Sequence, residues 1–295
     1  MTVTESIHSI LASDAKPIRV YRWKGSAPAR GIVQIAHGMG EHALRYRPIV
    51  HALVSAGYIV YANDHRGHGE LAAQANALGD FGPGGFPVLV DDMAKVTQMA
   101  RDAEKGKPLI LLGHSMGSFA AQLYLLDHSE LLDGVALSGT TALDLLGAAA
   151  MAGRWKLEDL NASFEPARTP FDWLSRDKAV VDAYIADPLC GFNVNAESYG
   201  SLFAVAPRLA TVQEIGRIRH DLPMFLFVGD LDPVNAKLTW FQPLIDRYRE
   251  SGLTDVSWHV YGNARHEVLN EINRSEVVTN LRAWIDRVTG SDASN

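Results

Sequence analysis

The sequence has little cysteine, no excess of positive charge and no long apolar run. Cys190 is the single cysteine in 295 residues, so the chain cannot form an internal disulfide bond and has no cysteine cluster for a metal. Lysine and arginine number 27 against 34 aspartate and glutamate residues, giving a net charge of -7. With no basic stripe along the chain, this balance argues against a nucleic-acid partner.

The apolar segments are also short. None approaches the ~20 residues that a membrane-spanning helix needs. Residues 1–19 lack the basic start and apolar run of a signal peptide. We therefore expect a cytoplasmic protein with no transmembrane segment. A chain of 295 residues is long enough to bury a large core in one or two domains.

What the sequence does contain is an alternation of strand-like and helix-like segments. Residues 6–11 and 18–23 partly alternate between apolar and polar around a turn at residues 14–17, which predicts an antiparallel hairpin. Further along, short apolar strands alternate with helices, which predicts a mostly parallel sheet covered by helices on both faces. The expected strands are 31–36, 58–62, 109–112, 132–138, 223–228 and 256–261, and the expected helices are 42–56, 87–103, 118–128, 235–250 and 267–288.

The alternation stops in the middle of the chain. Residues 140–217 contain no clear strand, but have helix-like pieces and scattered aromatic side chains. We interpret the chain as one α/β core, residues 1–139 and 218–295, interrupted by an inserted, mainly helical cap or lid at residues 140–217.

The segment Gly113-His114-Ser115-Met116-Gly117 lies between an expected strand and an expected helix. Gly-x-Ser-x-Gly in that setting is the pattern of a nucleophile elbow, a strained turn that presents a serine at the N-terminus of a helix. The motif alone is weak, because a chain of this composition would contain it by chance roughly one time in eight. Without further support it could also be a turn with a surface serine.

A serine hydroxyl needs a base to take its proton and a carboxylate to orient that base. In the order typical of this elbow, the acid and then the histidine follow the serine. His266 is the one later histidine that directly follows an expected strand. The others have less suitable places: His114 in the elbow, His128 at a helix end, His220 before a strand and His259 within one.

Two aspartates compete for the role of the acid. Asp230 and Asp232 both follow the buried strand 223–228. Asp232 is favoured because it lies further into the loop, next to Pro233, and can turn back toward His266. Asp230 is the alternative, and it could instead accept hydrogen bonds from turn amides.

The negative charge that develops on the substrate carbonyl needs two backbone donors. The amide of Met116 follows the candidate nucleophile, and Met39 lies in the glycine-containing loop 37–42 after the first parallel strand. We expect these two amides to form the oxyanion hole. Glu41 and Arg45 are four residues apart, a spacing that allows an ion pair on a helical turn.

The segment 64–69 contains two histidines three residues apart, His65 and His68. That spacing suits a metal only on a helix, and two glycines interrupt this segment. No third ligand is evident, so we expect a structural turn in which Asp64 and Arg66 are hydrogen-bonded. We expect no metal and no other cofactor.

These motifs together resemble the α/β-hydrolase superfamily, and within it the monoacylglycerol lipase and lysophospholipase-like group. The likeness implies the α/β-hydrolase fold and a catalytic triad of Ser115, Asp232 and His266 that works through an acyl-serine. The matching stretches are His37-Gly38-Met39-Gly40-Glu41-His42 with Arg45-Tyr46, Asp64-His65-Arg66-Gly67-His68-Gly69, Gly113-His114-Ser115-Met116-Gly117, Leu174-Ser175-Arg176-Asp177, Asp187-Pro188-Leu189 and Ala264-Arg265-His266-Glu267.

The resemblance also implies a substrate class. Monoacylglycerols, lysophospholipids or similar monoesters are expected, with contacts from cap residues such as Trp155, Phe171 and Trp173. Peripheral contact with a membrane through the cap is part of this expectation. Residues 141–153 are small and alanine-rich, which argues against strong insertion into a bilayer.

Other functions that use the same triad stay open as hypotheses. These are a general short-chain carboxylesterase, an amide or peptide hydrolase and a cofactor-free perhydrolase. The loop 37–42 lacks the His-Gly-Gly-Pro pattern of proline iminopeptidases, which disfavours that subgroup. Dehalogenases and epoxide hydrolases have an aspartate where Ser115 stands. A binding protein with a hydrolase fold would usually lack a triad member, and here all three are present.

Overall fold

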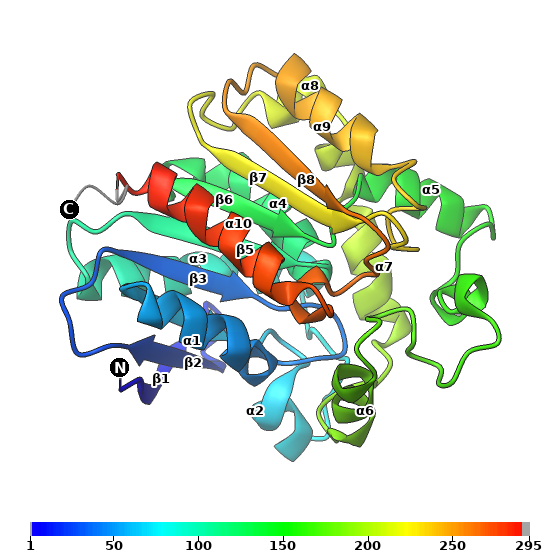
Figure 1. Cartoon of the computed structure of the whole chain (residues 1–295), viewed down its shortest axis with the longest axis horizontal. Helices are drawn as coiled ribbons and strands as arrows, with labels where there is room; N and C mark the ends of the chain where they lie inside the picture. Colours follow the sequence, from blue (N-terminus) through cyan, green and yellow to red (C-terminus); the bar gives the residue numbers. More distant parts are fainter. Residues whose placement is uncertain (1, 291–295) are drawn as a thin grey trace.

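The centre of the molecule is a sheet of eight strands in the order β1-β2-β4-β3-β5-β6-β7-β8 (Figure 1). The computed structural model describes residues 2–290. Strands β1 and β4 both run antiparallel to β2, and the remaining neighbours are parallel, so the expected hairpin and the mostly parallel sheet are confirmed. The strands are β1 Thr4–Leu11, β2 Pro17–Lys24, β3 Gly31–Ala36, β4 Tyr58–Asn63, β5 Leu109–His114, β6 Gly134–Ser138, β7 Met224–Gly229 and β8 Val256–Tyr261.

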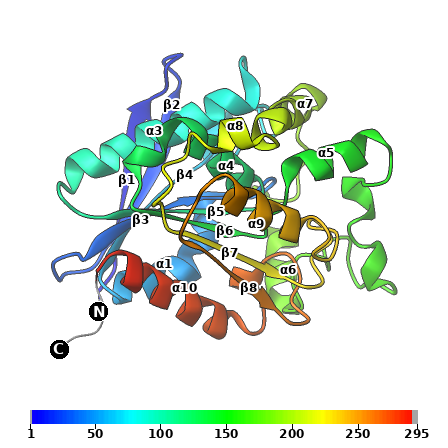
Figure 2. The ribbon, with the colours of Figure 1, turned by 90° about the horizontal axis from the view of Figure 1, so that it is seen from above.

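Helices cover both faces of the sheet (Figure 2). Because successive strand residues point to opposite faces, each central strand contributes to two apolar cores. In β5, Leu109 and Leu111 belong to one core, and Ile110 and Leu112 belong to the other. The first core contains α3 Gly85–Ala103, α4 Met116–His128 and α9 Phe241–Glu250, and the second contains α1 Arg47–Ser55 and α10 Arg274–Val288.

A helical insertion separates β6 from β7. Most of it lies beyond the ends of the strand arrows in Figure 1, on the side where the parallel strands finish, and its last helix, Val212–Ile215, lies beside α9. The described residues 140–217 contain no strand. The exact limits of a cap domain at 140–217 stay a prediction. The α-helices of the insertion are α5 Leu143–Met151, α6 Lys178–Ala186, α7 Ala196–Ala204 and α8 Val212–Ile215, and short 3-10 turns lie at Leu157–Asp159, Ala162–Phe164 and Ala206–Leu209.

The predicted start of α9, at residue 235, is wrong. The helix begins at Phe241, because three consecutive residues before it, Ala236, Lys237 and Leu238, have positive φ angles of 51°, 51° and 74°. This left-handed backbone is incompatible with a right-handed helix. The Asn235 side chain closes the turn by accepting the Leu238 N–H at 2.8 Å.

The predicted start of α10, at residue 267, is also wrong. A 3-10 turn at Val268–Asn270 comes first, and the helix begins at Arg274. The reason is Glu271, whose fully buried carboxylate accepts the N–H groups of Arg265 and Ile272, both at 2.9 Å. A carboxylate that binds backbone donors on either side keeps this segment in an irregular turn.

Two smaller differences occur near the start of the chain. The predicted helix 42–56 is divided into a 3-10 turn, Ala43–Tyr46, followed by α1. The short helix α2, Gly69–Gln74, is not predicted by the sequence. None of the helices within residues 2–290 has both the length and the apolar character needed to cross a membrane.

A buried network of hydrogen bonds joins α3 and α4 to strand β3. Gln34 of β3 donates to the carbonyl oxygen of Met93 at 3.0 Å and accepts from the Thr97 hydroxyl at 2.7 Å. The Tyr124 hydroxyl of α4 donates to Thr97 at 3.0 Å. Since α4 follows directly after Ser115, this network helps to hold the candidate nucleophile in place.

Replacing Thr97 should show how much this network contributes. Thr97→Val leaves the Gln34 oxygen and the Tyr124 hydroxyl without a partner in a site closed to water. We expect the free energy of unfolding to fall by about 2–3 kcal/mol. Urea denaturation measures this change. Thr97→Ser, which keeps the hydroxyl and loses one methyl group, should cost about 1 kcal/mol. Equal stability of the two variants would contradict the role of the hydroxyl.

Candidate active site

Ser115 occupies a sharp turn between β5 and α4. Its φ and ψ angles are 52° and -121°, a strained conformation for a residue with a side chain. Only glycine fits at the positions two residues before and two residues after Ser115. A Cβ at Gly117 would lie 2.1 Å from the Ala36 carbonyl oxygen, and one at Gly113 would lie 2.5 Å from the Gly117 carbonyl oxygen. The structure therefore has the strand-turn-helix geometry of a nucleophile elbow.

His266 and Asp232 form a buried hydrogen-bonded pair. Their side chains are 2% and 0% exposed, and the distance from His266 Nδ1 to Asp232 Oδ2 is 2.9 Å. The other carboxylate oxygen accepts the Val234 N–H at 2.8 Å, which fixes the carboxylate. Of the two candidate acids, Asp232 is the one that contacts the histidine, and no hydrogen bond joins Asp230 to His266 in the described residues.

The charge beside His266 sets its proton affinity. Burial by itself lowers the pKa of this histidine, but the carboxylates of Asp232, Glu267 and Glu41 together offset burial, with Asp232 contributing most, so the pKa of His266 is raised above its ordinary value of 6.5. With Nδ1 engaged by Asp232, Nε2 is the ring nitrogen that remains to accept a proton from a nucleophile.

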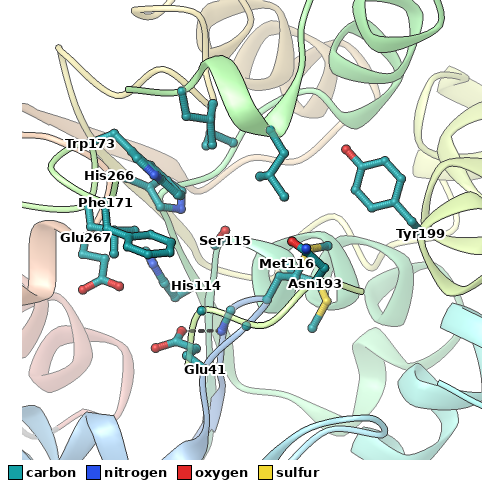
Figure 3. A pocket seen from close by; sticks show the side chains of 18 of the residues that line it. Glu41, His114, Ser115, Met116, Phe171, Trp173, Asn193, Tyr199, His266 and Glu267 are labelled. Atoms are coloured by element: carbon teal, nitrogen blue, oxygen red, sulfur yellow. Dashed lines mark hydrogen bonds between the residues drawn. The ribbon is translucent and has the colours of Figure 1, made fainter. Parts of the chain in front are cut away.

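Ser115 and His266 line the same cavity, which has a volume of about 470 Å³. Figure 3 shows both side chains directed into it. In the described residues no hydrogen bond to the Ser115 hydroxyl is formed. Contacts of this kind are often long in unliganded enzymes and shorten when substrate binds.

The loop 37–42 presents one amide that is not bonded to any protein group among residues 2–290. The Gly38 N–H donates to Glu41 Oε1 at 2.6 Å, and the Gly40 N–H donates to His68 Nε2 at 3.2 Å. Between them, the Met39 N–H has no acceptor in the described residues. Met39 also lines the cavity. This amide is therefore available to a bound oxyanion.

Met116 offers the second amide. It is the first residue of α4, and the first N–H groups of a helix have no partner within the helix. Met116 also lines the cavity, beside Ser115. The two expected oxyanion donors thus follow different strands, β3 and β5, and line one cavity.

The turn at residues 64–69 is structural, as predicted. Arg66 forms an ion pair with Asp92, with 2.6 Å between Nε and Oδ2, and a second one with Asp14. Asp64 accepts the Ala43 N–H at 3.0 Å. These contacts account for the charged side chains of the turn.

A role of this turn that is not predicted by the sequence is to support the oxyanion loop through histidines. His37 Nε2 accepts the His65 N–H at 2.9 Å, and its Nδ1 lies 2.8 Å from the Gly38 carbonyl oxygen. His68 Nε2 accepts the Gly40 N–H. Burial lowers the pKa of both His37 and His68 to about 3, so each ring is neutral near pH 7 and can accept a hydrogen bond.

The cavity wall contains the three aromatic side chains expected from the insertion. Trp155, Phe171 and Trp173 all line it. Trp173 also contacts the base, since its ring centroid lies 5.1 Å from that of His266 and its carbonyl oxygen accepts the His266 N–H at 3.3 Å (Figure 3).

One group of side chains in the described part of the chain has ligand atoms close enough to hold a metal. Atoms of His42, Asp187 and Cys190 lie within 4.8 Å of one another. His42 Nε2 and Asp187 Oδ2 are already hydrogen-bonded at 2.9 Å. Burial raises the pKa of the Cys190 thiol, which disfavours a thiolate ligand. An ordinary hydrogen bond accounts for this arrangement, and we assign no metal to it.

Comparison with known proteins places the chain in a family. Residues 27–273 match the family described as serine aminopeptidase, S33. A monoacylglycerol lipase of Mycolicibacterium smegmatis is 30% identical over 288 residues, which cover 96% of this chain and 97% of the relative. The monoglyceride lipase of Mus musculus is 27% identical over 286 residues, covering 95% and 90% of the two chains.

Solved structures agree with this result. A thermostable carboxyl esterase from Bacillus coagulans, in complex with glycerol, has a TM-score of 0.86 and 26% identity over 98% of this chain and 100% of its own. The chain belongs to the serine aminopeptidase, S33, family and is a serine hydrolase with the α/β-hydrolase fold.

Proposed function

We propose that the protein hydrolyses carboxylic esters through an acyl-serine, with monoacylglycerols and similar monoesters as its substrates. The observation that carries this proposal is the buried pair of His266 and Asp232 in the cavity that contains Ser115. Similarity to monoacylglycerol lipases over 96% of the chain supports the choice of substrate class.

Each residue has a defined step in the proposed reaction. His266 takes the proton of Ser115 as the serine oxygen attacks the ester carbonyl, and Asp232 holds the imidazole and stabilises its cation. The amides of Met39 and Met116 donate to the oxyanion. The alcohol then leaves with the proton from His266. A water molecule repeats the sequence to release the acid.

The insertion supplies the proposed acyl site. We propose that residues 140–217 act as a cap and that Trp155, Phe171 and Trp173 contact the acyl chain, since these side chains line the cavity. Its volume of about 470 Å³ lies in the range of small-molecule sites. Lysophospholipids carry a comparable acyl chain and belong to the proposal, as does peripheral contact of the cap with a membrane. The cytoplasm stays a prediction for the location, consistent with the single cysteine, Cys190.

A short-chain carboxylesterase is the second candidate, favoured by the similarity to the Bacillus coagulans carboxyl esterase. Rates on monoacylglycerols and p-nitrophenyl esters of graded chain length separate the two. An optimum at long chains supports the lipase, and a decline beyond short chains supports the general esterase. The family is described as serine aminopeptidase, S33, so aminoacyl anilides belong in the same panel.

Removing the nucleophile or the base should abolish turnover. We expect Ser115→Ala and His266→Ala to lower kcat on a p-nitrophenyl ester by about 10⁴-fold or more, because the two residues act as one unit. His259→Ala, which changes the histidine inside β8, is the matched control and should keep the wild-type rate.

A fluorophosphonate probe provides an independent measurement. It should label the wild-type protein and leave Ser115→Ala unlabelled, because only an activated serine reacts. Full activity of Ser115→Ala would show that another residue is the nucleophile. A folded wild-type protein that is not labelled would favour a binding protein with a hydrolase fold.

The raised pKa of His266 predicts the pH dependence of the reaction. His266 must be neutral to act as a base, so kcat/KM should fall as the pH drops through a pKa above 6.5. Asp232→Asn removes the charge that favours the imidazolium. The residual activity, about 10⁴-fold lower, should therefore have its acid limb at lower pH.

The matched control for this experiment is Asp230→Asn. It changes the competing aspartate of the same loop and should leave both the rate and the pH profile close to wild type. An acid limb that stays in place or moves to higher pH in Asp232→Asn would contradict the assignment of Asp232.

A further inference from the structure

Catalysis here depends on the relative position of two loops from different strands. The oxyanion loop, residues 37–42, follows β3, and the histidine loop, residues 262–271, follows β8. In the sheet, β5, β6 and β7 lie between these two strands. The donors of one loop and the base of the other must fit the same reacting ester, and errors of about 1 Å are costly.

The guanidinium group of Arg45 lies between the two loops. It contacts Glu267 through two parallel hydrogen bonds, Nη1 to Oε1 at 2.8 Å and Nη2 to Oε2 at 2.9 Å. It also pairs with Glu41 of the oxyanion loop. The side chains are 10%, 4% and 3% exposed for Arg45, Glu267 and Glu41, so water screens these contacts little.

Each carboxylate also accepts hydrogen bonds from residues in or next to its own loop. Glu41 Oε1 accepts the Gly38 N–H at 2.6 Å and the Tyr46 hydroxyl at 2.8 Å. Glu267 follows His266 directly, and its Oε2 accepts from the Asn270 amide at 2.9 Å. A shift of the guanidinium would therefore be transmitted to Gly38, which precedes Met39, and to the neighbour of the base.

A third contact joins Arg45 to the insertion. Its guanidinium carbon lies 4.7 Å from the ring centroid of Tyr184, within the range of a cation–π interaction. The Tyr184 hydroxyl donates to the Gly40 carbonyl oxygen at 2.9 Å. The same arginine thus contacts a residue of the insertion that is itself bonded to the oxyanion loop.

A contribution to folding stability does not by itself explain why three charged side chains are buried together. Taking three charged side chains out of water costs free energy, and apolar residues of similar volume often serve the fold as well. The planar guanidinium, in contrast, fixes direction and distance to a carboxylate at two points. Glu41 and Glu267 line the cavity, whereas Arg45 is absent from its described lining, so Arg45 acts through its partners.

We propose that Arg45 is a positioning residue that sets the oxyanion loop against the histidine loop through Glu41 and Glu267. The inference rests on the proposed ester hydrolysis. It assigns to Arg45 the alignment of the Met39 amide with His266 and gives it no contact with substrate.

Arg45→Lys tests this role, since lysine keeps the charge but cannot bind both carboxylates in the same fixed geometry. We expect kcat on a p-nitrophenyl ester to fall about 10- to 100-fold while KM stays within about threefold. The affinity for a trifluoromethyl ketone, which binds as a tetrahedral adduct, should fall in the same proportion as kcat/KM. The urea midpoint of unfolding reports whether the variant is folded.

The matched control is Arg247→Lys. Arg247 forms a comparable two-point pair with Asp144, at 2.8 and 3.0 Å, and bonds the carbonyl oxygen of Leu209. None of these partners lies in the two catalytic loops. This variant should resemble Arg45→Lys in its effect on the unfolding midpoint and keep the wild-type kcat.

A double-mutant cycle with Glu267→Gln tests the path of the effect. If Arg45 acts through Glu267, the double variant should lose little more activity than the worse single variant. Fully additive losses would overturn that path. The proposal is also wrong if Arg45→Lys keeps kcat, if it raises KM alone, or if its activity falls only with the folded fraction.

These outcomes are distinct from a failure of the proposed function. Full activity in Ser115→Ala would remove the acyl-serine mechanism itself. Loss of activity in Ser115→Ala together with a wild-type kcat in Arg45→Lys would leave ester hydrolysis intact and overturn only the role of Arg45.

Discussion

The site depends on two places where backbones approach so closely that no side chain fits between them. A Cβ at Gly117 would lie 2.1 Å from the carbonyl oxygen of Ala36, and a Cβ at Gly229 would lie 2.1 Å from that of Ala264. The first contact joins the helix after Ser115 to the start of the oxyanion loop. The second joins the loop of the acid to the loop of the histidine. The relative position of these loops therefore depends on close backbone packing that only glycine permits.

The buried histidines around the site differ in the direction of their pKa shifts. His37, in the oxyanion loop, and His68, which contacts this loop, are neutral because burial lowers their pKa, and they accept backbone N–H groups. His266 is equally enclosed, yet the neighbouring carboxylates, Asp232 above all, raise its pKa. The same residue type thus serves as support in one environment and as a candidate base in the other, and the difference lies in the carboxylates that surround it.

The sequence predicts most of the sheet, the helices on both of its faces and some of the cavity-lining residues, among them Ser115 and His266. These features are predictable because strands and the elbow leave local patterns such as Gly113 to Gly117. It misplaces the starts of α9 and α10, since the side chains of Asn235 and Glu271 hold turns there that propensity alone does not reveal. Pairing of Glu41 with Arg45 is foreseeable from their spacing. Glu267 is 222 residues from Arg45, so its contact depends on the tertiary fold.

The insertion both lines the cavity and contacts the loop that carries the base. This double role constrains how substrate specificity can change. Trp173 is predicted as a substrate contact, and it does line the cavity, but its backbone also accepts the His266 N–H while Leu174 accepts the Glu267 N–H at 2.8 Å. A substitution that reshapes the wall here also disturbs the loop that carries the base. Trp155, for which the structure shows no bond to that loop in the described residues, can vary with less effect on the chemistry. Selectivity for the acyl chain should therefore diverge more readily on the Trp155 side of the cavity than on the Trp173 side.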